Sequence, residues 1–275
     1  MSTSFKALLL KARHQVYTLL SGHNLSKLRG EGYDFAELRE YQVGDDIRKI
    51  NWTITAKLGK PYIKELHTNR ELSVCIAAIL DGSVYVGMHH TKQEIMAETA
   101  ALLGFSAQHS NDLFSGVLYT QAQTTTTPPT KQIFEIERFC KALYEYHALH
   151  TKVDLQASID DLFNRLTKPS LLFILHDFLE PVDLSLLAQR HEVIALIIRD
   201  RNEEQMHHKG WVYLQDPRSD LQQESYIGRK SHTRYLGKRQ AHDASLMAHF
   251  SRYDIRYVKL FTDEPPIEKL MTLFR

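Results

Sequence analysis

Residues 72–83 read LSVCIAAILDGS, a nearly unbroken apolar run that ends in an aspartate, a glycine and a serine. Such a run suits a strand that is covered on both faces, because a buried strand needs no alternation of polar and apolar positions. We therefore predict that 72–80 is the first strand of a sheet, and that Asp81 and Ser83 stand at its carboxyl end.

Strands and helices are predicted to alternate from this run to the end of the chain. We predict strands at 113–120, 170–176, 192–199 and 255–261, helices at 93–108, 131–147, 155–166, 182–190, 238–251 and 265–274, a loop at 124–129 and a β-hairpin insertion at about 211–235. This alternation is typical of an α/β fold with a doubly wound, mainly parallel, Rossmann-like sheet. Ligands of such sheets bind beyond the carboxyl ends of strands at the switch point, where Asp81 and Asp177 are expected.

The first 70 residues follow a different pattern. An amphipathic helix is predicted over 5–20, and glycines then punctuate short alternating segments over 21–70, which favours turns and antiparallel strands. We expect residues 1–70 to supply the N-terminal helix and the β segment of an accessory antiparallel subdomain, 71–200 the core, and 201–275 the hairpin insertion and the final α/β unit. The accessory subdomain would combine 21–70 with the hairpin at 211–235.

Composition excludes several classes of protein. The 34 basic and 33 acidic residues give a net charge of +1, so no global field attracts nucleic acid. Cys75 and Cys140 both lie in apolar contexts and are expected to be buried thiols, which suits a reducing compartment. The longest apolar runs are far shorter than the roughly 18 residues that span a bilayer. We expect a cytoplasmic protein without a membrane span.

Residues 29–52 read RGEGYDFAELREYQVGDDIRKINW, and this segment, which we call the signature segment, is dense in charge, glycine and aromatic residues. Together with Ala56, Lys57, 61–62 and 64–65, it resembles the bacterial family known as domain of unknown function 58 (DUF58). Weaker matches at 81–83, at 177–178 and around Tyr235 fall in the expected order. Members of this family are von Willebrand factor A-like proteins that are often encoded beside MoxR-class AAA+ ATPases.

The resemblance implies a von Willebrand A-type core with a metal-ion-dependent adhesion site. That site takes Asp-x-Ser-x-Ser after the first strand, a threonine from a second loop and an aspartate after the fourth strand. Asp81, Ser83 and Asp177 match three of these positions. Carboxylate and hydroxyl oxygens suit Mg²⁺, which is the cofactor that such a site would hold.

Two of the implied ligands are missing. Tyr85 stands in the place of the second serine, and a phenol oxygen extends too far from the backbone to replace a serine hydroxyl. Val153 stands where the threonine is expected, with Thr151 two residues earlier as a weak substitute. We therefore expect a degenerate site that holds no metal; if Mg²⁺ binds, Asp81, Ser83 and Asp177 would hold it.

The signature segment has two compatible interpretations. Its charges and Trp52 could form a partly buried network that organises the small β segment, since isolated surface ion pairs contribute little. Alternatively, Arg39, Asp45, Asp46, Arg48 and Trp52 could contact a partner protein directly.

Other motifs give no firm activity. The sequence has no P-loop, so any ATPase must be a separate polypeptide, and it has no Gly-x-Ser-x-Gly nucleophile motif. Most of the 15 histidines, including His147 and His150, are expected to be structural. The basic residues at 228–235 are expected to form a structural or protein-binding face.

The sequence thus predicts a non-enzymatic protein-binding adaptor. The resemblance supplies the partners: a MoxR-class AAA+ ATPase and a client protein, in chaperone-like assembly or remodelling of protein complexes. The alternative is a metal-dependent phosphohydrolase or nuclease that uses Asp81 and Asp177.

Overall fold

The computed structural model of the chain describes residues 3–23, 34–42, 45–67, 72–205, 210–219 and 221–273. The chain divides into two compact units, one formed by residues 1–16 with 72–275 and the other by residues 17–71. We call them the sheet unit and the small unit.

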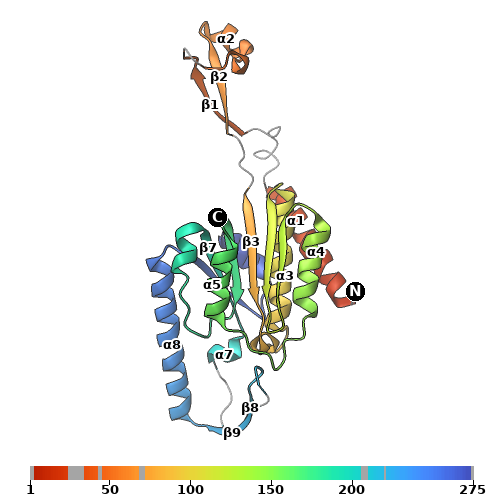
Figure 1. The fold of residues 1–275 in the computed structure, drawn as a ribbon, viewed down its shortest axis with the longest axis vertical. Helices are drawn as coiled ribbons and strands as arrows, with labels where there is room; N and C mark the ends of the chain where they lie inside the picture. The colour runs from red at the N-terminus through yellow and green to blue at the C-terminus, as the bar shows by residue number, and fades with distance from the viewer. Residues whose placement is uncertain are drawn as a thin grey trace. The chain divides into compact units, whose positions relative to one another are not determined.

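A six-stranded, mainly parallel sheet is the centre of the sheet unit (Figure 1). Its strands, in spatial order, are β10 (Arg256–Phe261), β7 (Glu192–Arg199), β6 (Leu171–His176), β3 (Ser73–Ile79), β4 (Leu113–Tyr119) and β5 (Thr124–Thr130). From β3 the chain builds outward through β4 and β5, then returns to the other side of β3 to add β6, β7 and β10. The switch point between β3 and β6 is therefore where an open α/β sheet places its ligands.

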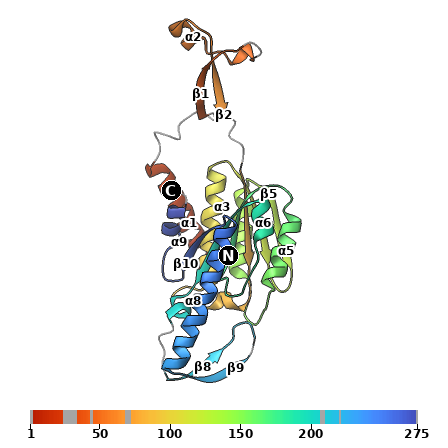
Figure 2. The same ribbon diagram turned by 90° about the vertical axis from the view of Figure 1, so that its left-hand side faces the viewer.

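Helices cover both faces of this sheet (Figures 1 and 2). The bounds are α1 (Thr3–His23), α3 (Lys92–His109), α4 (Ile133–Glu145), α5 (Leu155–Arg165), α6 (Ser185–Arg190), α7 (Arg201–Gln205), α8 (Arg229–Arg252) and α9 (Pro266–Leu273). The side chains of α5, α6 and α8 pack in one core with alternate residues of the central strands, such as Ala77 and Ile174. On the other face α3 and α4 approach β4 so closely that Phe139 fills the space beside Gly116. The predicted α/β class and mainly parallel sheet are confirmed.

The expected loop at 124–129 is wrong, because these residues lie in β5. This strand pairs antiparallel with β4, and the ladder is irregular between Phe114 and Gly116. Prolines at 128 and 129 pointed to a loop, but β5 is an edge strand, where a missing N–H donor is tolerated.

The predicted hairpin insertion is present but shorter than expected. It comprises β8 (Gly210–Gln215) and β9 (Gln222–Ile227), and α8 begins directly afterwards at Arg229. In both views the hairpin lies beside the first turns of α8 (Figures 1 and 2). The basic residues that follow 228 therefore belong to a helix.

The small unit contains its own antiparallel pair, β1 (Asp34–Glu40) and β2 (Tyr62–His67). Between these strands lie the short 3₁₀ helix η1 (Ile47–Lys49) and α2 (Trp52–Leu58), which the sequence reading missed. Asn51 caps α2 at its start, and Gly59 closes it with a left-handed φ of 73°.

The expected accessory subdomain combines 21–70 with the hairpin, but these segments belong to different compact units. β1–β2 and β8–β9 are separate two-stranded sheets, and the hairpin belongs to the sheet unit. The physical reason is a set of polar contacts that hold the hairpin to the carboxyl edge of the large sheet. None of the described helices is long and apolar enough to cross a bilayer.

Candidate functional site

Asp81 and Asp177 lie at the carboxyl edge of β3 and β6, as the sequence predicted. Asp81 begins the short 3₁₀ helix η2 (Gly82–Tyr85), and its Oδ1 accepts a hydrogen bond of 2.9 Å from the backbone N–H of Ser83. Asp177 Oδ1 accepts a bond of 3.2 Å from the N–H of Leu179. The exposed fractions of Asp81, Ser83 and Asp177 are only 1%, 5% and 3%. The edge therefore holds two buried carboxylates, which need compensating charge.

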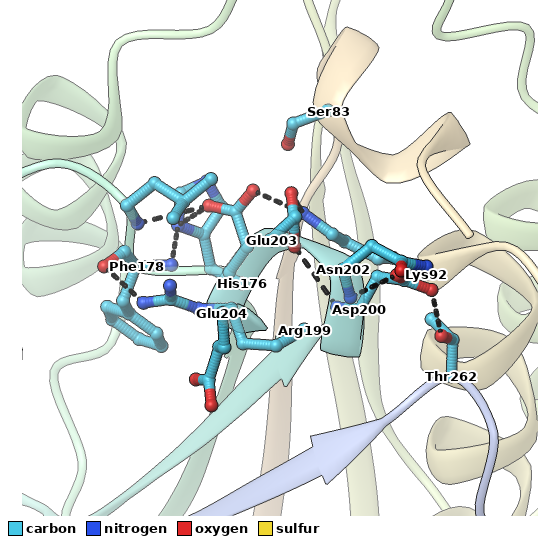
Figure 3. Close-up of polar contacts among 12 residues, drawn as sticks. Ser83, Lys92, His176, Phe178, Arg199, Asp200, Asn202, Glu203, Glu204 and Thr262 are labelled. Atoms are coloured by element: carbon cyan, nitrogen blue, oxygen red, sulfur yellow. Dashed lines mark hydrogen bonds and ion pairs between the residues drawn. The ribbon is translucent and has the colours of Figure 1, made fainter. Parts of the chain in front are cut away.

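Lys92 supplies that charge to Asp177. Its Nζ lies 3.1 Å from Asp177 Oδ2 and 2.6 Å from Glu203 Oε1, and the side chain is 1% exposed. Figure 3 shows Lys92 beside Glu203 and Asp200 near the start of α7. Lys92 is the first residue of α3, where Thr91 and Glu94 form a reciprocal capping box. The cap fixes the helix start, and with it the position of the ammonium group.

Arg218 supplies positive charge to Asp81. Its Nε lies 2.7 Å from Asp81 Oδ2, and its Nη1 donates to Glu180. Arg218 belongs to the hairpin tip, which we define as residues 216–219. Asp216 Oδ1 accepts a 3.0 Å bond from the N–H of Arg218 and so shapes this turn.

The hairpin tip is in close backbone contact with the sheet edge. The N–H of His150 donates to the carbonyl oxygen of Pro217 at 2.8 Å. A Cβ added to Gly82 would stand 1.9 Å from the same oxygen, so a glycine is needed here. The tip therefore rests directly on the loop that contains Asp81.

The electrostatics of the site favour ionised side chains. Burial opposes the charge on Asp177, but Lys92 together with the neighbouring polar side chains outweighs it and holds the pKa of Asp177 well below its ordinary value. Burial also opposes the charge on Arg218, but Asp81 and Asp177 raise its pKa. Burial lowers the pKa of His176, whose Nδ1 accepts a bond from the N–H of Phe178 at 3.0 Å. His176 is therefore expected to be neutral at pH 7, and Asp177 charged.

A second layer of charge lies behind the two aspartates. Arg199 is fully buried, and its Nη2 donates to the carbonyl oxygen of Phe178 at 2.9 Å. Phe178 has a left-handed φ of 49°, which is strained for a bulky residue. Lys259 Nζ lies 2.7 Å from both Glu204 and Asp243. The Arg199 contact holds the loop after β6, and the Lys259 contacts join β10 to α7 and α8.

The other residues considered as metal ligands turn away from the carboxylates. Tyr85 Oη is 2.9 Å from His147 Nδ1, so the phenol is engaged elsewhere. Thr151 Oγ1 donates to the carbonyl oxygen of Ala148 at 2.5 Å, and Val153 offers no oxygen. Ser83 Oγ is buried and close enough to Asp177 to stabilise its charge, but it forms no regular hydrogen bond with the described residues.

These residues do not fit a divalent metal ion. Mg²⁺ needs about six oxygen ligands at about 2.1 Å. Among the described residues no group of three or more His, Cys, Asp or Glu side chains is placed to hold a metal. Asp81 and Asp177 each have a cation at hydrogen-bonding distance instead. No local pattern in the sequence points to Arg218, which is far from Asp81 along the chain, whereas the Thr91–Glu94 capping box points to Lys92 as the first residue of a helix.

The signature residues lie in the small unit, in exposed positions. Arg48 pairs with Asp46 at 3.1 Å, with side chains that are 91% and 39% exposed. Asp45 Oδ2 accepts a 2.8 Å bond from the N–H of Gln42, and Trp52 is 66% exposed. Residues 29–33 and 43–44 and the side chain of Arg39 lie outside the described part of the chain. Asp46 and Arg48 thus pair with each other at an exposed position, and the two interpretations of the signature segment stay predictions.

A cavity of about 410 Å³ lies at the opposite, amino edge of the sheet. Ser73, Thr127, Lys168 and Ser170 are among its lining residues, which include no carboxylate and no thiol. It therefore offers neither a general base nor a strong nucleophile.

Comparison with known proteins gives a family and distant structural likenesses. The model of the family described as "Protein of unknown function DUF58" matches residues 37–245. The uncharacterized proteins Rv1480 of Mycobacterium tuberculosis and Mb1516 of Mycobacterium bovis are each 25% identical over 234 residues, which cover 82% of this chain and 74% of theirs.

Two solved structures are also similar to the chain. BatB from Bacteroides thetaiotaomicron aligns with a TM-score of 0.40 and 8% identity, over 74% of this chain and 97% of its own. An aerotolerance-related membrane protein from Bacteroides fragilis aligns with a TM-score of 0.42 and 11% identity, over 69% of this chain and 91% of its own.

Proposed function

Because the chain belongs to the DUF58 family, we propose that it is a non-enzymatic, protein-binding adaptor that works with a MoxR-class AAA+ ATPase. In this proposal the ATPase hydrolyses ATP, and the adaptor links it to a client protein during assembly or remodelling of a complex. The partner class comes from the resemblance of the signature segment to MoxR-associated proteins.

We also propose that the sheet unit is a von Willebrand A-like core. The support is its strand order, in which β3 lies inside the sheet, β5 is an antiparallel edge strand and two aspartates follow β3 and β6.

One observation supports the adaptor proposal most directly: the exposure of the signature residues. Arg48 and Trp52 present a guanidinium group and an indole ring to solvent in the small unit. Tryptophan and arginine are enriched among the residues that dominate binding energy at protein interfaces. The side chains whose residue types identified the family are thus available to a partner.

A hydrolytic function finds less support. A metal-dependent phosphohydrolase would need carboxylates that are open to a metal and a phosphate. Asp81 and Asp177 are almost completely buried, and each is ion-paired with a cation of the chain itself. Such a site has no free position for substrate.

The binding proposal is tested by titrating the purified chain against a purified MoxR-class ATPase from the same organism, with and without ATP. We expect association, and we expect Trp52→Ala to weaken it about tenfold or more. Trp211→Ala is the matched control, because Trp211 is 71% exposed but lies on β8 of the sheet unit. Equal losses in the two variants would contradict the assignment to Trp52, and no association in any nucleotide state would contradict the partner class.

The enzymatic alternative is tested by a phosphoesterase screen in Mg²⁺ and Mn²⁺. We expect no turnover above the buffer rate. Metal-dependent turnover that Asp81→Ala abolishes would overturn the adaptor proposal.

A further inference from the structure

We propose that Lys92 and Arg218 take the place of a divalent cation at the carboxyl edge of the sheet, and that Arg218 thereby fastens the β8–β9 hairpin to it. The site is a closed ion cluster that is neutralised by the chain's own side chains. This inference does not depend on the identity of any partner.

The position of Lys92 is the first support. Its Nζ lies between a carboxylate that follows β6 and one on α7, 3.1 Å from Asp177 Oδ2 and 2.6 Å from Glu203 Oε1. A metal that bridged these oxygens at about 2.1 Å would need the volume that the ammonium group fills. The lysine and a metal therefore cannot both occupy the space between Asp177 Oδ2 and Glu203 Oε1.

The position of Arg218 is the second support. A guanidinium group spreads one positive charge over three nitrogens and can lie between two carboxylates. Here Nη1 donates to Glu180, and Nε lies 2.7 Å from Asp81 Oδ2 in an ion pair without regular hydrogen-bond geometry. Asp81 is thus engaged by a side chain that comes from the hairpin tip.

The balance of buried charge is the third support. Asp81, Asp177 and Glu203 have side chains that are 2%, 2% and 16% exposed, whereas Lys92 and Arg218 are 1% and 17% exposed. Fully buried Arg199 adds a third positive charge near Asp177. Each of these three carboxylates already has a cation of the chain beside it, and the same cations also face Glu180 and, 3.6 Å from Arg199, Asp243. Partners within the chain therefore compensate the buried charge without a metal ion.

The hairpin gains its attachment from the same contacts. The strands β8 and β9 pair only with each other in the described sheets, and a lone two-stranded hairpin is marginally stable in water. The Arg218–Asp81 pair and the His150–Pro217 bond join the hairpin tip to the sheet edge. The ion pair that compensates the charge of Asp81 therefore also contributes to attaching the hairpin.

The test is a titration of the full chain with Mn²⁺. Calorimetry measures the binding, and thermal unfolding measures the Tm with and without Mn²⁺. The wild-type chain is expected to bind no Mn²⁺ at millimolar concentration and to keep the same Tm in Mn²⁺ and in EDTA. Stoichiometric binding that is lost in Asp177→Asn would overturn the proposal.

Lys92→Met removes the ammonium group and leaves Asp177 and Glu203 facing each other. We expect Mn²⁺ to raise the Tm of this variant by about 2–4 °C or more, because a ligand that binds only the folded state stabilises it. Lys259→Met is the matched control: it also removes a lysine held by two carboxylates, but Arg239 still lies 3.9 Å from Glu204 and 3.8 Å from Asp243. The proposal would be contradicted if Mn²⁺ did not change the Tm of Lys92→Met. It would also be contradicted if Mn²⁺ raised the Tm of Lys259→Met by the same amount.

Arg218→Met tests the attachment of the hairpin separately. We expect amide exchange in β8 and β9 to accelerate at least tenfold, while exchange in β3 and β6 is unchanged. Unchanged exchange in the hairpin would refute its fastening by Arg218. If Lys92→Met does not fold on its own, its refolding yield with and without Mn²⁺ is measured instead of its Tm. The Mn²⁺ titration of the wild-type chain tests the proposal whether or not this variant folds.

Discussion

The carboxylates at the edge of the large sheet and the charged residues of the small unit belong to the same chemical types but stand in opposite surroundings. Asp177 and Lys92 form an ion pair whose side chains are 2% and 1% exposed, whereas Asp46 and Arg48 form one that is 39% and 91% exposed. A buried pair must be complete to be tolerated, while an exposed pair can exchange its partner for another molecule at little cost. The difference explains why we give the first region a structural role, and it supports the proposal that the second region contacts a partner.

The largest effect should come from breaking the buried pair. Lys92→Met leaves Asp177 and Glu203 without their shared cation, and loss of one partner of a buried pair costs about 3–5 kcal/mol of unfolding free energy. Urea unfolding would measure it.

The same experiment contains its own controls. Lys92→Met/Asp177→Asn should recover part of the loss, because it removes one uncompensated charge. Arg48→Met, which breaks the exposed pair, should leave the urea midpoint of the sheet unit unchanged. Equal losses for Lys92→Met and Arg48→Met would remove the contrast between the two regions.

The next effect concerns the contact between the hairpin tip and the loop after β3. Gly82→Ala would push a methyl group against the carbonyl oxygen of Pro217, and forced repacking of this kind costs about 1–3 kcal/mol. Gly237→Ala is the control, since that position in α8 has open space and an alanine there should stabilise the helix by about 0.5–1 kcal/mol. Thermal unfolding of both variants checks the signs, and a neutral Gly82→Ala would show that the tip does not rest on the loop.

A smaller effect is expected within the small unit. Asn51 Oδ1 accepts a bond of 3.3 Å from the N–H of Ile54, and loss of such a cap costs about 1 kcal/mol. Asn51→Ala should speed amide exchange in α2 and leave the central strands unaffected. Asp154→Ala removes the corresponding cap of α5 in the sheet unit, so its effect should appear in α5 instead. Exchange that changes in both units for either variant would indicate that they unfold together.

The last prediction concerns the two cysteines, which should scarcely react with thiol reagents while the chain is folded. Both lie in the sheet unit, and burial raises the pKa of Cys75 to about 11 and raises that of Cys140 as well. Thiol reagents at pH 8 should therefore label the folded chain very slowly, since the thiolate is the reactive form. Labelling rates measure opening of the sheet unit, and Asn51→Ala should not alter them. Faster labelling in that variant would contradict the separation of the units.

The sequence was sufficient for the central strands because burial on both faces leaves an unmistakable apolar run, as at 72–80 and 192–199. The sequence was insufficient where the position of a strand at the sheet edge, or a cap at a helix end, decided which secondary structure formed. β5 was read as a loop because of Pro128 and Pro129, and α2 was missed although Asn51 and Gly59 are good cap residues.

The candidate site could be predicted only in part. Asp81 and Asp177 were found because strand ends meet at one edge of a parallel sheet. Arg218 could not be found, since its approach to Asp81 depends on where an inserted hairpin folds. Tyr85 was interpreted as the residue that prevents metal binding, yet its hydroxyl interacts with His147, and the groups that occupy the site are Lys92 and Arg218.

The most direct test of this account is a crystal structure of the wild-type chain grown in millimolar Mn²⁺, with anomalous data collected for manganese. We predict no anomalous peak between Asp81 and Asp177, with Lys92 Nζ about 3 Å from Asp177 and Arg218 in contact with Asp81. A manganese peak bound to either aspartate, with Lys92 displaced, would contradict the claim that the chain's own cations neutralise this site.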